Sequence, residues 1–281
     1  MVYYFYHFYY FSISICFESE ERVPMKRLSV ITISYNSEDT IRSTMLSVLK
    51  QKYRPLQYVL IDGSSKDKTN EIIRELLPEF NNAGIDIVTV SEPDRGISDA
   101  FNKGISLSTG DVIGIINSGD SYEENALEKV MQQDWDNIDL LCGDILWIDS
   151  ANKIEYIRRS STDWSRLRLE MTVMHPSCFV KKAVYDECGM FDISFRYTMD
   201  YDLVCRFHRM NKKLVYIPLT IADVAAGGIS DDDIDRTKNE IFSINRLNNV
   251  NALYSRLHWK WVKCRRFLAA KLKKKKLFFK K

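Results

Sequence analysis

The sequence lacks the signatures of several large protein classes. Its six cysteines form no CxxC pair and no metal-ligand spacing, so we expect the reduced, mostly buried thiols of a cytosolic protein and no disulfide framework. The pattern GxxxxGK(S/T) is absent, which excludes a P-loop NTPase. No internal repeat and no Gly/Ser-rich linker divides the 281 residues. The chain is long enough for one large domain with additions.

Long apolar runs are also missing. A membrane-spanning helix needs about 20 apolar residues, and the best candidate, residues 1–17, contains five tyrosines. A signal peptide would need a basic start and a small-residue cleavage site, and this segment has neither. We therefore expect synthesis to begin at Met25, with a short interfacial aromatic anchor as the alternative.

Acidic residues are absent from the end of the chain. Residues 259–281 contain eleven of the 40 basic residues, so the other 29 and all 38 acidic residues lie in residues 1–258, a net charge of −9. Trp, Phe and Leu are interleaved with the tail's lysines and arginines, a composition typical of an interfacial helix on anionic lipid. The alternatives are a nucleic-acid arm or a disordered end. We expect an anionic membrane surface as partner and no nucleic acid.

Strand and helix patterns alternate from Met25 onward. Leu28–Ser34 is an apolar, β-branched run typical of a strand covered on both faces. Further strands are expected at Tyr58–Ile61, Ile85–Val90 and Val112–Ile116, separated by helices at 38–50, 67–77 and 97–107. This order predicts an α/β fold with a doubly wound, mostly parallel central sheet.

After Asp139 the pattern becomes mixed. Leu140–Ile148 and Lys153–Arg158 predict an antiparallel pair around a polar turn. We expect another strand at Thr172–Val180, a helix at 200–210, a strand at Leu214–Ile217 stopped by Pro218, and one amphipathic helix over 239–257. Without a linker, the two halves are expected to share one sheet.

Polar, turn-forming residues follow each of the first four expected strands. They are Tyr35-Asn36, Asp62–Asp67, Glu92–Gly96 and Asn117–Asp120. Ligands of open parallel sheets bind beyond the carboxyl ends of the strands, so these four segments together indicate a binding site. The plain alternative is that any surface loop is polar.

The segments SVITISYNSEDTI, LIDGSSKDKT, SEPDRGISDAFNKGI and GDVIGIINSGDSY resemble the successive motifs of family 2 glycosyltransferases with the GT-A fold. The likeness covers about residues 27–235 and is closest to the bacterial branch that builds exopolysaccharide and O-antigen units. It implies inverting transfer of a sugar from a nucleotide diphosphate (UDP or GDP) donor to a saccharide hydroxyl, usually with Mg²⁺ or Mn²⁺.

The same resemblance assigns candidate donor residues. Tyr35 corresponds to the residue that stacks on the donor base, Asp62 to the acid that bonds this base, and Arg95 to a donor-contacting arginine. The donor-binding residues that we expect are Tyr35, Asn36, Asp62, Ser65, Asp94, Arg95, Asp99, Asn117 and His175. His175 has the alternative of being a packed core residue.

Asp120 resembles the last acid of the family's metal-binding DxD motif. Asn117 and Gly119 replace acids that are common elsewhere in the family, so we expect weak metal binding until donor phosphates supply more oxygens. The structural alternative for Asp120 is a turn residue.

The catalytic base implied by the resemblance is Asp200, in the segment FRYTMDYDLVCRF. A carboxylate there suits an inverting displacement, which needs a base for the acceptor hydroxyl. The alternatives are that Asp200 only caps a helix, or that Asp202 is the base.

The expected organisation is an extension over residues 1–24, a glycosyltransferase domain over 25–235 and C-terminal helices with a basic tail over 236–281. We expect a peripheral enzyme at the cytoplasmic face of the cell membrane, acting on a saccharide or lipid-linked saccharide. A catalytically weak nucleotide-sugar-binding scaffold is the alternative. A sugar-phosphate nucleotidyltransferase would need a Gly-rich, basic loop after the first strand, and Tyr35–Glu38 is not one.

Overall fold

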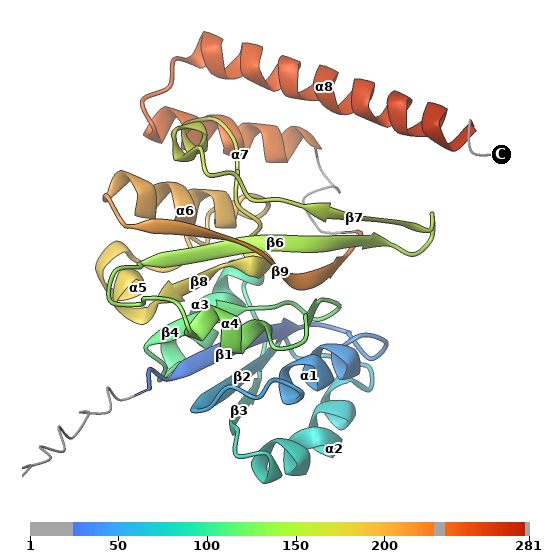
Figure 1. Ribbon diagram of the computed structural model, residues 1–281, viewed down its shortest axis with the longest axis vertical. Coiled ribbons are helices and arrows are strands. Elements are labelled where there is room, and N and C mark those ends of the chain that lie inside the picture. The colour runs from blue at the N-terminus through green and yellow to red at the C-terminus, as the bar shows by residue number, and fades with distance from the viewer. Residues whose placement is uncertain (1–24, 228–233, 279–281) are drawn as a thin grey trace, which may run out of the picture.

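A computed structural model describes residues 25–227 and 234–278 of the chain. In its first half, strands alternate with helices, and the strands pair in parallel in the order β3-β2-β1-β4 (Figure 1). The elements are β1 (Leu28–Ser34), α1 (Ile41–Leu49), β2 (Leu56–Asp62), α2 (Thr69–Asn82), β3 (Asp86–Ser91), α3 (Ile97–Leu107) and β4 (Val112–Ile115). The parallel half predicted from the sequence is thereby confirmed.

The second half continues the same sheet. Its elements are β5 (Ser121–Tyr122), α4 (Ala126–Met131), β6 (Leu140–Asp149), β7 (Ile154–Arg158), β8 (Phe179–Lys181), α5 (Lys182–Cys188), α6 (Met199–Arg209) and β9 (Leu214–Ala225). Strand β8 joins the halves because it runs antiparallel to both β4 and β6. The antiparallel β6–β7 pair and the shared sheet agree with the sequence prediction.

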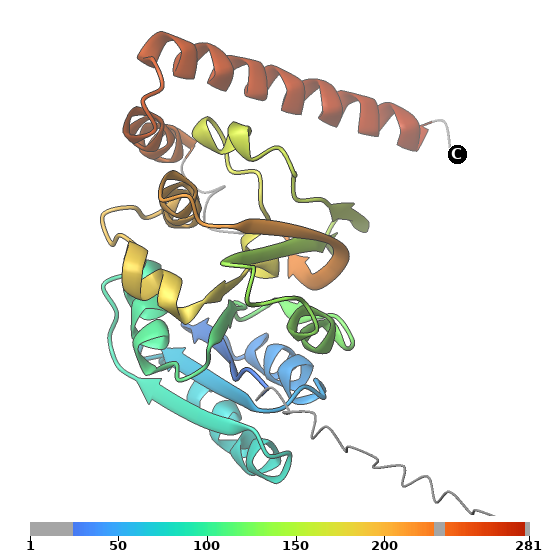
Figure 2. The ribbon, with the colours of Figure 1, turned by 60° about the vertical axis from the view of Figure 1, so that its left-hand side comes forward.

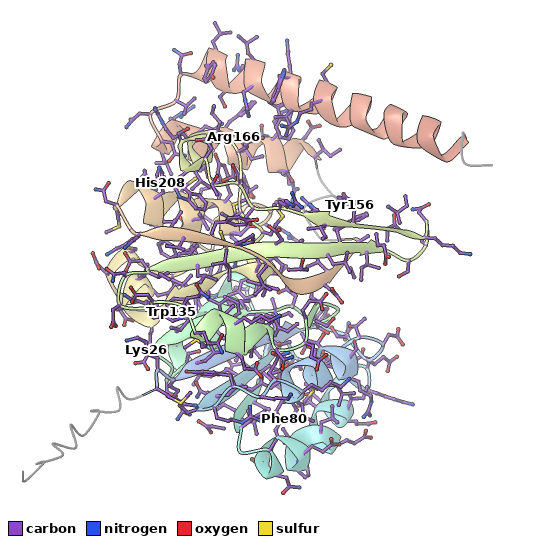
Figure 3. The ribbon with its side chains drawn as sticks, in the orientation of Figure 1. Lys26, Phe80, Trp135, Tyr156, Arg166 and His208 are labelled. Carbon is purple, nitrogen blue, oxygen red and sulfur yellow. The ribbon has the colours of Figure 1, made fainter. Side chains whose placement is uncertain are left out.

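Helices cover both faces of the sheet and bury two apolar clusters. One cluster includes side chains of α1, α2 and α4, and the other includes side chains of α3, α5 and α6. Phe80 of α2 points toward the sheet (Figure 3) and stacks on Tyr58 of β2 with 5.2 Å between ring centroids. All but one of the residues of β1 are buried, as the sequence predicted for a strand covered on both faces, and every residue of β2 is buried as well.

Two strand predictions were wrong. The expected strand at Thr172–Val180 is reduced to β8, because His175–Ser177 forms a 3₁₀ turn in which Pro176 has no N–H to donate. Strand β9 does not stop at Pro218 but continues to Ala225. The exposed Pro218 lies where the β6–β9 register shifts between Cys142 and Asp144, and such an irregularity requires no ladder bond from proline.

The expected single helix over 239–257 is instead two helices, α7 (Ile234–Leu247) and α8 (Ala252–Phe278). The break falls at Asn249, whose φ of 56° is left-handed, a conformation that asparagine tolerates better than most residues. Helix α8 packs on α7 and then extends beyond it (Figure 2). Within residues 25–227 and 234–278, no helix is long and apolar enough to cross a membrane.

Candidate active site

The carboxyl ends of the four parallel strands open into a cleft of about 720 Å³. Its walls come from the loops after β1, β2, β3 and β4, from helix α3, and from two segments of the second half, at 175–176 and 197–200. The lining residues predicted from the sequence are Tyr35, Asp94, Asn117, His175 and Asp200. Segments far apart in the chain therefore meet here because the strands are parallel.

Tyr35 stands at the wall formed by the loop after β1. Its side chain is 64% exposed, so one ring face can receive a planar ligand. A Cβ on Gly63 would lie 3.3 Å from the Tyr35 ring and 2.9 Å from an Asp94 carboxylate oxygen. The absence of a side chain at Gly63 thus keeps the space between Tyr35 and Asp94 open.

Asn36 and Ser65 do not line the cleft but join the loops that form it. The backbone N–H of Asn36 donates to Ser65 Oγ at 2.8 Å. In return, the N–H of Lys66 donates to Asn36 Oδ1 at 2.9 Å. These bonds join the β1 loop, which carries Tyr35, to the β2 loop.

Asp62 is buried and fully used by hydrogen bonds. Its carboxylate accepts bonds from the Ser65 hydroxyl and N–H, from Ser91 Oγ at 2.7 Å and from Asn70 Nδ2 at 2.8 Å. Burial favours a higher pKa, but these donors outweigh it and lower the pKa of Asp62. Asp62 is therefore ionised and joins the loop after β2 to the end of β3. Its contact with a donor base stays a prediction.

The loop after β3 is organised by Lys103 of α3, which the sequence reading missed. Lys103 Nζ lies 2.6 Å from Asp94 and 2.9 Å from Glu92. Its position four residues after Asp99 on a helix was the available signal, because this spacing brings opposite charges together; the two charged groups lie 3.8 Å apart. Lys103 thereby fixes the cleft residue Asp94.

Arg95 and Asp99 pair with each other outside the main cleft. Arg95 donates to Asp99 through its side chain at 2.9 Å and through its N–H at 3.1 Å. The Arg95 side chain is 74% exposed and lines a smaller adjoining pocket of about 310 Å³, which shares Gly96, Ile97 and Met199 with the cleft.

Asn117 and Asp120 belong to one turn after β4, in which the Asp120 N–H donates to the Asn117 carbonyl at 3.1 Å. Asp120 is buried, and one of its carboxylate oxygens accepts a bond from the N–H of Ala225 at 3.2 Å. Burial raises the pKa of Asp120 to about 7, although the Ala225 bond favours the ionised form. A positive charge beside Asp120 would keep it ionised.

The turn offers oxygen ligands to a divalent cation. The side-chain oxygen of Asn117, which lines the cleft, is buried and has no hydrogen-bond partner among the residues that the structure describes. An orphaned amide oxygen and a buried carboxylate fit a hard cation such as Mg²⁺ or Mn²⁺. No group of three or more His, Cys, Asp or Glu side chains is placed to bind a metal within residues 25–227 and 234–278. The remaining ligands would have to come from a bound molecule.

Asp200 lines the cleft from the opposite wall, in the first turn of α6. It is not the helix cap, because α6 begins at Met199 and the cap position is Thr198. Asp202 points elsewhere: it is buried, is not among the residues lining the cleft, and pairs with Arg206 at 2.6 Å. Asp200 is thus the acid of this segment that a substrate in the cleft can reach.

His175 packs against the rings of Phe101 and Phe191, each with a centroid 5.8 Å away. Burial lowers the pKa of His175, although the nearby carboxylate of Asp200 opposes this shift. The imidazole is therefore neutral at pH 7. It lines the cleft near Asp200 and is also packed, so the two readings of His175 from the sequence coexist.

Residues 29–189 match the family model for glycosyl transferase family 2. Among characterised proteins, a PGL/p-HBAD biosynthesis glycosyltransferase from Mycobacterium bovis is 26% identical over 214 residues, which is 74% of this chain and 80% of that protein.

Solved structures share the fold. TarS of S. aureus, residues 1–349 in complex with UDP-GlcNAc, aligns with a TM-score of 0.63 and 14% identity over 82% of this chain and 69% of that one. The mannosyltransferase PcManGT of Pyrobaculum calidifontis, in complex with GDP-Man and Mn²⁺, aligns with a TM-score of 0.59 and 16% identity over 79% and 64%. The GT-A fold expected from the sequence is confirmed.

Proposed function

Because this chain belongs to glycosyl transferase family 2 and is a glycosyltransferase, we propose that it transfers a sugar with inversion from a nucleoside diphosphate to a saccharide hydroxyl. One observation carries the proposal: the cleft brings Tyr35 and Asn117 from the strand ends together with Asp200 from α6. A donor lying between these walls would have its base near Tyr35 and its sugar near Asp200.

The charge of the cleft supports a donor that arrives with a metal ion. Asp94 and Asp200 line the cleft, and no lysine or arginine does so among the described residues. Because Lys103 already pairs with Asp94, a diphosphate alone would meet no free cationic side chain on the described walls of the cleft. Asn117 and Asp120 would hold the cation, which supplies the positive charge that the departing nucleoside diphosphate needs. The structural relatives bind UDP-GlcNAc or GDP-Man with Mn²⁺, which supports a UDP- or GDP-sugar here.

Asp200 performs the proton transfer in this proposal. Its carboxylate accepts the proton of the acceptor hydroxyl while the hydroxyl oxygen attacks the anomeric carbon and the nucleoside diphosphate leaves. A direct displacement of this kind inverts the anomeric configuration. Neutral His175 places no positive charge beside the Asp200 carboxylate.

The C-terminal helices support a membrane-bound acceptor. Exposed apolar side chains on α8 share one helix face, at Leu253, Tyr254, Leu257 and Trp261. The basic tail follows them in the sequence, so apolar and cationic groups together suit an anionic lipid surface. We extend the proposal to a lipid-linked saccharide acceptor, a place at the cytoplasmic face of the membrane and a role in cell-surface polysaccharide synthesis.

Release of nucleoside diphosphate from a panel of UDP- and GDP-sugars with Mn²⁺ tests the function. Wild type is expected to turn over one donor, slowly with water and faster with a saccharide acceptor. Asp200→Asn is expected to be about 10²- to 10⁴-fold slower, while the surface variant Asp186→Asn, which removes a 64% exposed acid, keeps full rate. Donor binding without turnover by wild type would favour the scaffold alternative, and retained turnover in Asp200→Asn would remove Asp200 as the base.

A further inference from the structure

Helix α6, which carries Asp200 in its first turn, has no capping hydrogen bond from its own cap residue. Thr198 occupies the cap position of α6 but makes no capping bond with its side chain. The first N–H groups of a helix have no partner within it, and in α6 they begin at the cap residue Thr198. The N–H of Thr198, and those of Arg196 and Tyr197 in the loop before it, take their acceptor from α7.

Glu240 of α7 supplies the missing acceptor. Its Oε1 accepts the N–H of Arg196 at 3.0 Å. Its Oε2 accepts the N–H of Tyr197 at 2.9 Å, the N–H of Thr198 at 3.0 Å and Thr198 Oγ1 at 3.0 Å. One carboxylate thus binds three consecutive backbone amides and a hydroxyl. A negative charge at this end also suits the α6 dipole.

The bound segment belongs to the cleft. Tyr197, Met199 and Asp200 all line it. A shift of the 196–198 backbone would therefore move the wall that carries the base. Phe195, just before this segment, accepts a bond from Ser98 Oγ of α3 at 3.2 Å, so the loop is held between α3 and α7.

A second attachment lies on the other side of Asp200. The hydroxyl of Tyr201 lies 2.9 Å from the side-chain amide of Asn245 in α7. The same amide lies 2.8 Å from Ser255 Oγ of α8. All three residues are buried, at 2%, 1% and 3% exposure. Helix α7 therefore holds the chain both before and after Asp200, and α8 holds α7.

We propose that Glu240 is a positioning residue for catalysis, which fixes Asp200 in the cleft by clamping residues 196–198. The inference rests on the proposed role of Asp200 as base. It makes the C-terminal helices part of the catalytic apparatus, although they lie outside the stretch 29–189 that matches the family. A base displaced by about 1 Å can cost on the order of 10²-fold in rate.

Hydrogen–deuterium exchange tests the clamp itself. The full-length protein and Glu240→Gln, which keeps the side-chain length but loses an acceptor and the charge, are compared with Asp235→Asn. Asp235 lies on the same helix, and its side chain is 85% exposed. Within the described residues its carboxylate pairs with Lys238. Exchange at amides 196–198 is expected to quicken in Glu240→Gln and to stay unchanged in Asp235→Asn. Unchanged exchange in both would overturn the proposal.

Kinetics test its consequence. With the nucleotide sugar that wild type hydrolyses, kcat is expected to fall 10- to 100-fold in Glu240→Gln while the affinity for the nucleoside diphosphate stays within twofold. Thr198→Val, which deletes one bond from the loop side, gives a smaller fall and serves if the first variant does not fold. If folded Glu240→Gln exchanged faster but kept its full kcat, the clamp would be purely structural, which would contradict the proposed role in catalysis. If Asp200→Asn kept its activity, the proposed base would fail independently of the clamp.

Discussion

At the scale of single residues, four aspartates near the strand and helix ends have four different environments. Asp62 accepts several hydrogen bonds, and Asp202 pairs with Arg206. Asp120 pairs with no cation in the described part of the chain, and Asp200 faces the cleft. Burial and hydrogen bonding, and not residue type, therefore decide which acid is available for chemistry.

Tyr35 gives a direct test of the donor-base site. Stacking of a base on an aromatic ring is worth about 1–3 kcal/mol, so Tyr35→Ala should weaken nucleotide binding roughly 5- to 150-fold. Tyr35→Phe keeps the ring and should bind within about threefold of wild type, since no hydrogen bond of the Tyr35 hydroxyl is described. Calorimetric titration measures both variants, and equal loss in the two would contradict stacking.

Asp223 of β9 gives a pH-dependent test of stability. Burial, with added repulsion from Glu123 and Glu155, raises the pKa of Asp223 to about 6 from its ordinary 3.8. The folded state therefore binds this proton more tightly than the unfolded state, so the group costs stability above pH 6 and stops doing so as the pH falls toward 4.

Asp223→Asn should consequently raise the thermal unfolding midpoint at pH 8 and leave it nearly unchanged at pH 4. Asp186→Asn, a surface acid paired with Lys182, is the control and should shift neither midpoint. An Asp223→Asn effect of the same size at both pH values would show that the carboxylate's ionisation is not the cause.

Sequence reading at this scale found the cleft residues that follow strands, because a strand end fixes where the next side chain lies. It missed Glu240, whose partners are backbone atoms in a distant segment. It also missed Lys103, although its partner Asp94 lies in the loop just before the same helix. It also left open whether Asp200 or Asp202 is the base. Side chains two positions apart on a helix point in different directions, and which of the two is buried depends on the ion pair with Arg206.

At the scale of elements, helix α3 sits unusually close to β1. A Cβ on Gly104 would lie 2.5 Å from Cγ2 of the buried Ile31. This contact sets the height of α3 above the sheet, and α3 carries Ile97, Ala100 and Phe101 of the cleft wall.

Gly104→Ala should therefore destabilise the protein, even though alanine favours helices by about 1 kcal/mol over glycine. Overpacking a buried contact costs about 1–3 kcal/mol, so the net loss in unfolding free energy is expected near 1 kcal/mol, with weaker nucleotide binding. Ser106→Ala on the exposed side of the same helix is the control and should be neutral or slightly stabilising. Urea unfolding distinguishes the two, and a more stable Gly104→Ala would contradict the close contact.

Most elements of the first half were predictable because β1, β2 and β4 are almost wholly buried and the helices between the strands are amphipathic. The failures were local. The sequence predicted that a strand ends at Pro218. Strand β9 tolerates this proline because its pairing with β6 is irregular there. The break between α7 and α8 depends on one left-handed residue, Asn249, which a period-based reading passes over.

At the scale of the whole molecule, one sheet joins the half that carries the proposed donor site to the half that carries the proposed base, and α7 and α8 pack at the end of the second half (Figure 1). The family and the fold were readable from four ordered motifs and are confirmed. Two further sequence features, the motif Gly227–Ser230 that could form a loop over the donor and the acidic run Asp231–Asp233, lie largely outside the described residues, as does the segment 1–24. The bonds from Glu240 to residues 196–198 could not be predicted from the sequence, because they join residues over 40 positions apart.

The proposed membrane surface makes a prediction at this scale. The double variant Leu257→Glu/Trp261→Glu places two charges on the exposed face of α8 and should lose most binding to vesicles of mixed phosphatidylcholine and phosphatidylglycerol. Ile157→Glu/Met210→Glu changes two exposed apolar residues elsewhere and should bind as wild type does. Co-sedimentation measures both, and equal binding by the two double variants would remove α8 as the docking surface.

The central claim is that the cleft at the strand ends binds a nucleoside diphosphate together with a divalent cation. Calorimetric titration of UDP, GDP and CDP, with and without Mn²⁺, into wild type, Asp120→Asn and Asp186→Asn tests it most directly. The account predicts that one nucleotide binds wild type and Asp186→Asn when Mn²⁺ is present, and that Asp120→Asn binds it at least about tenfold more weakly. Failure of folded wild-type protein to bind any of the three nucleotides with Mn²⁺ would contradict it.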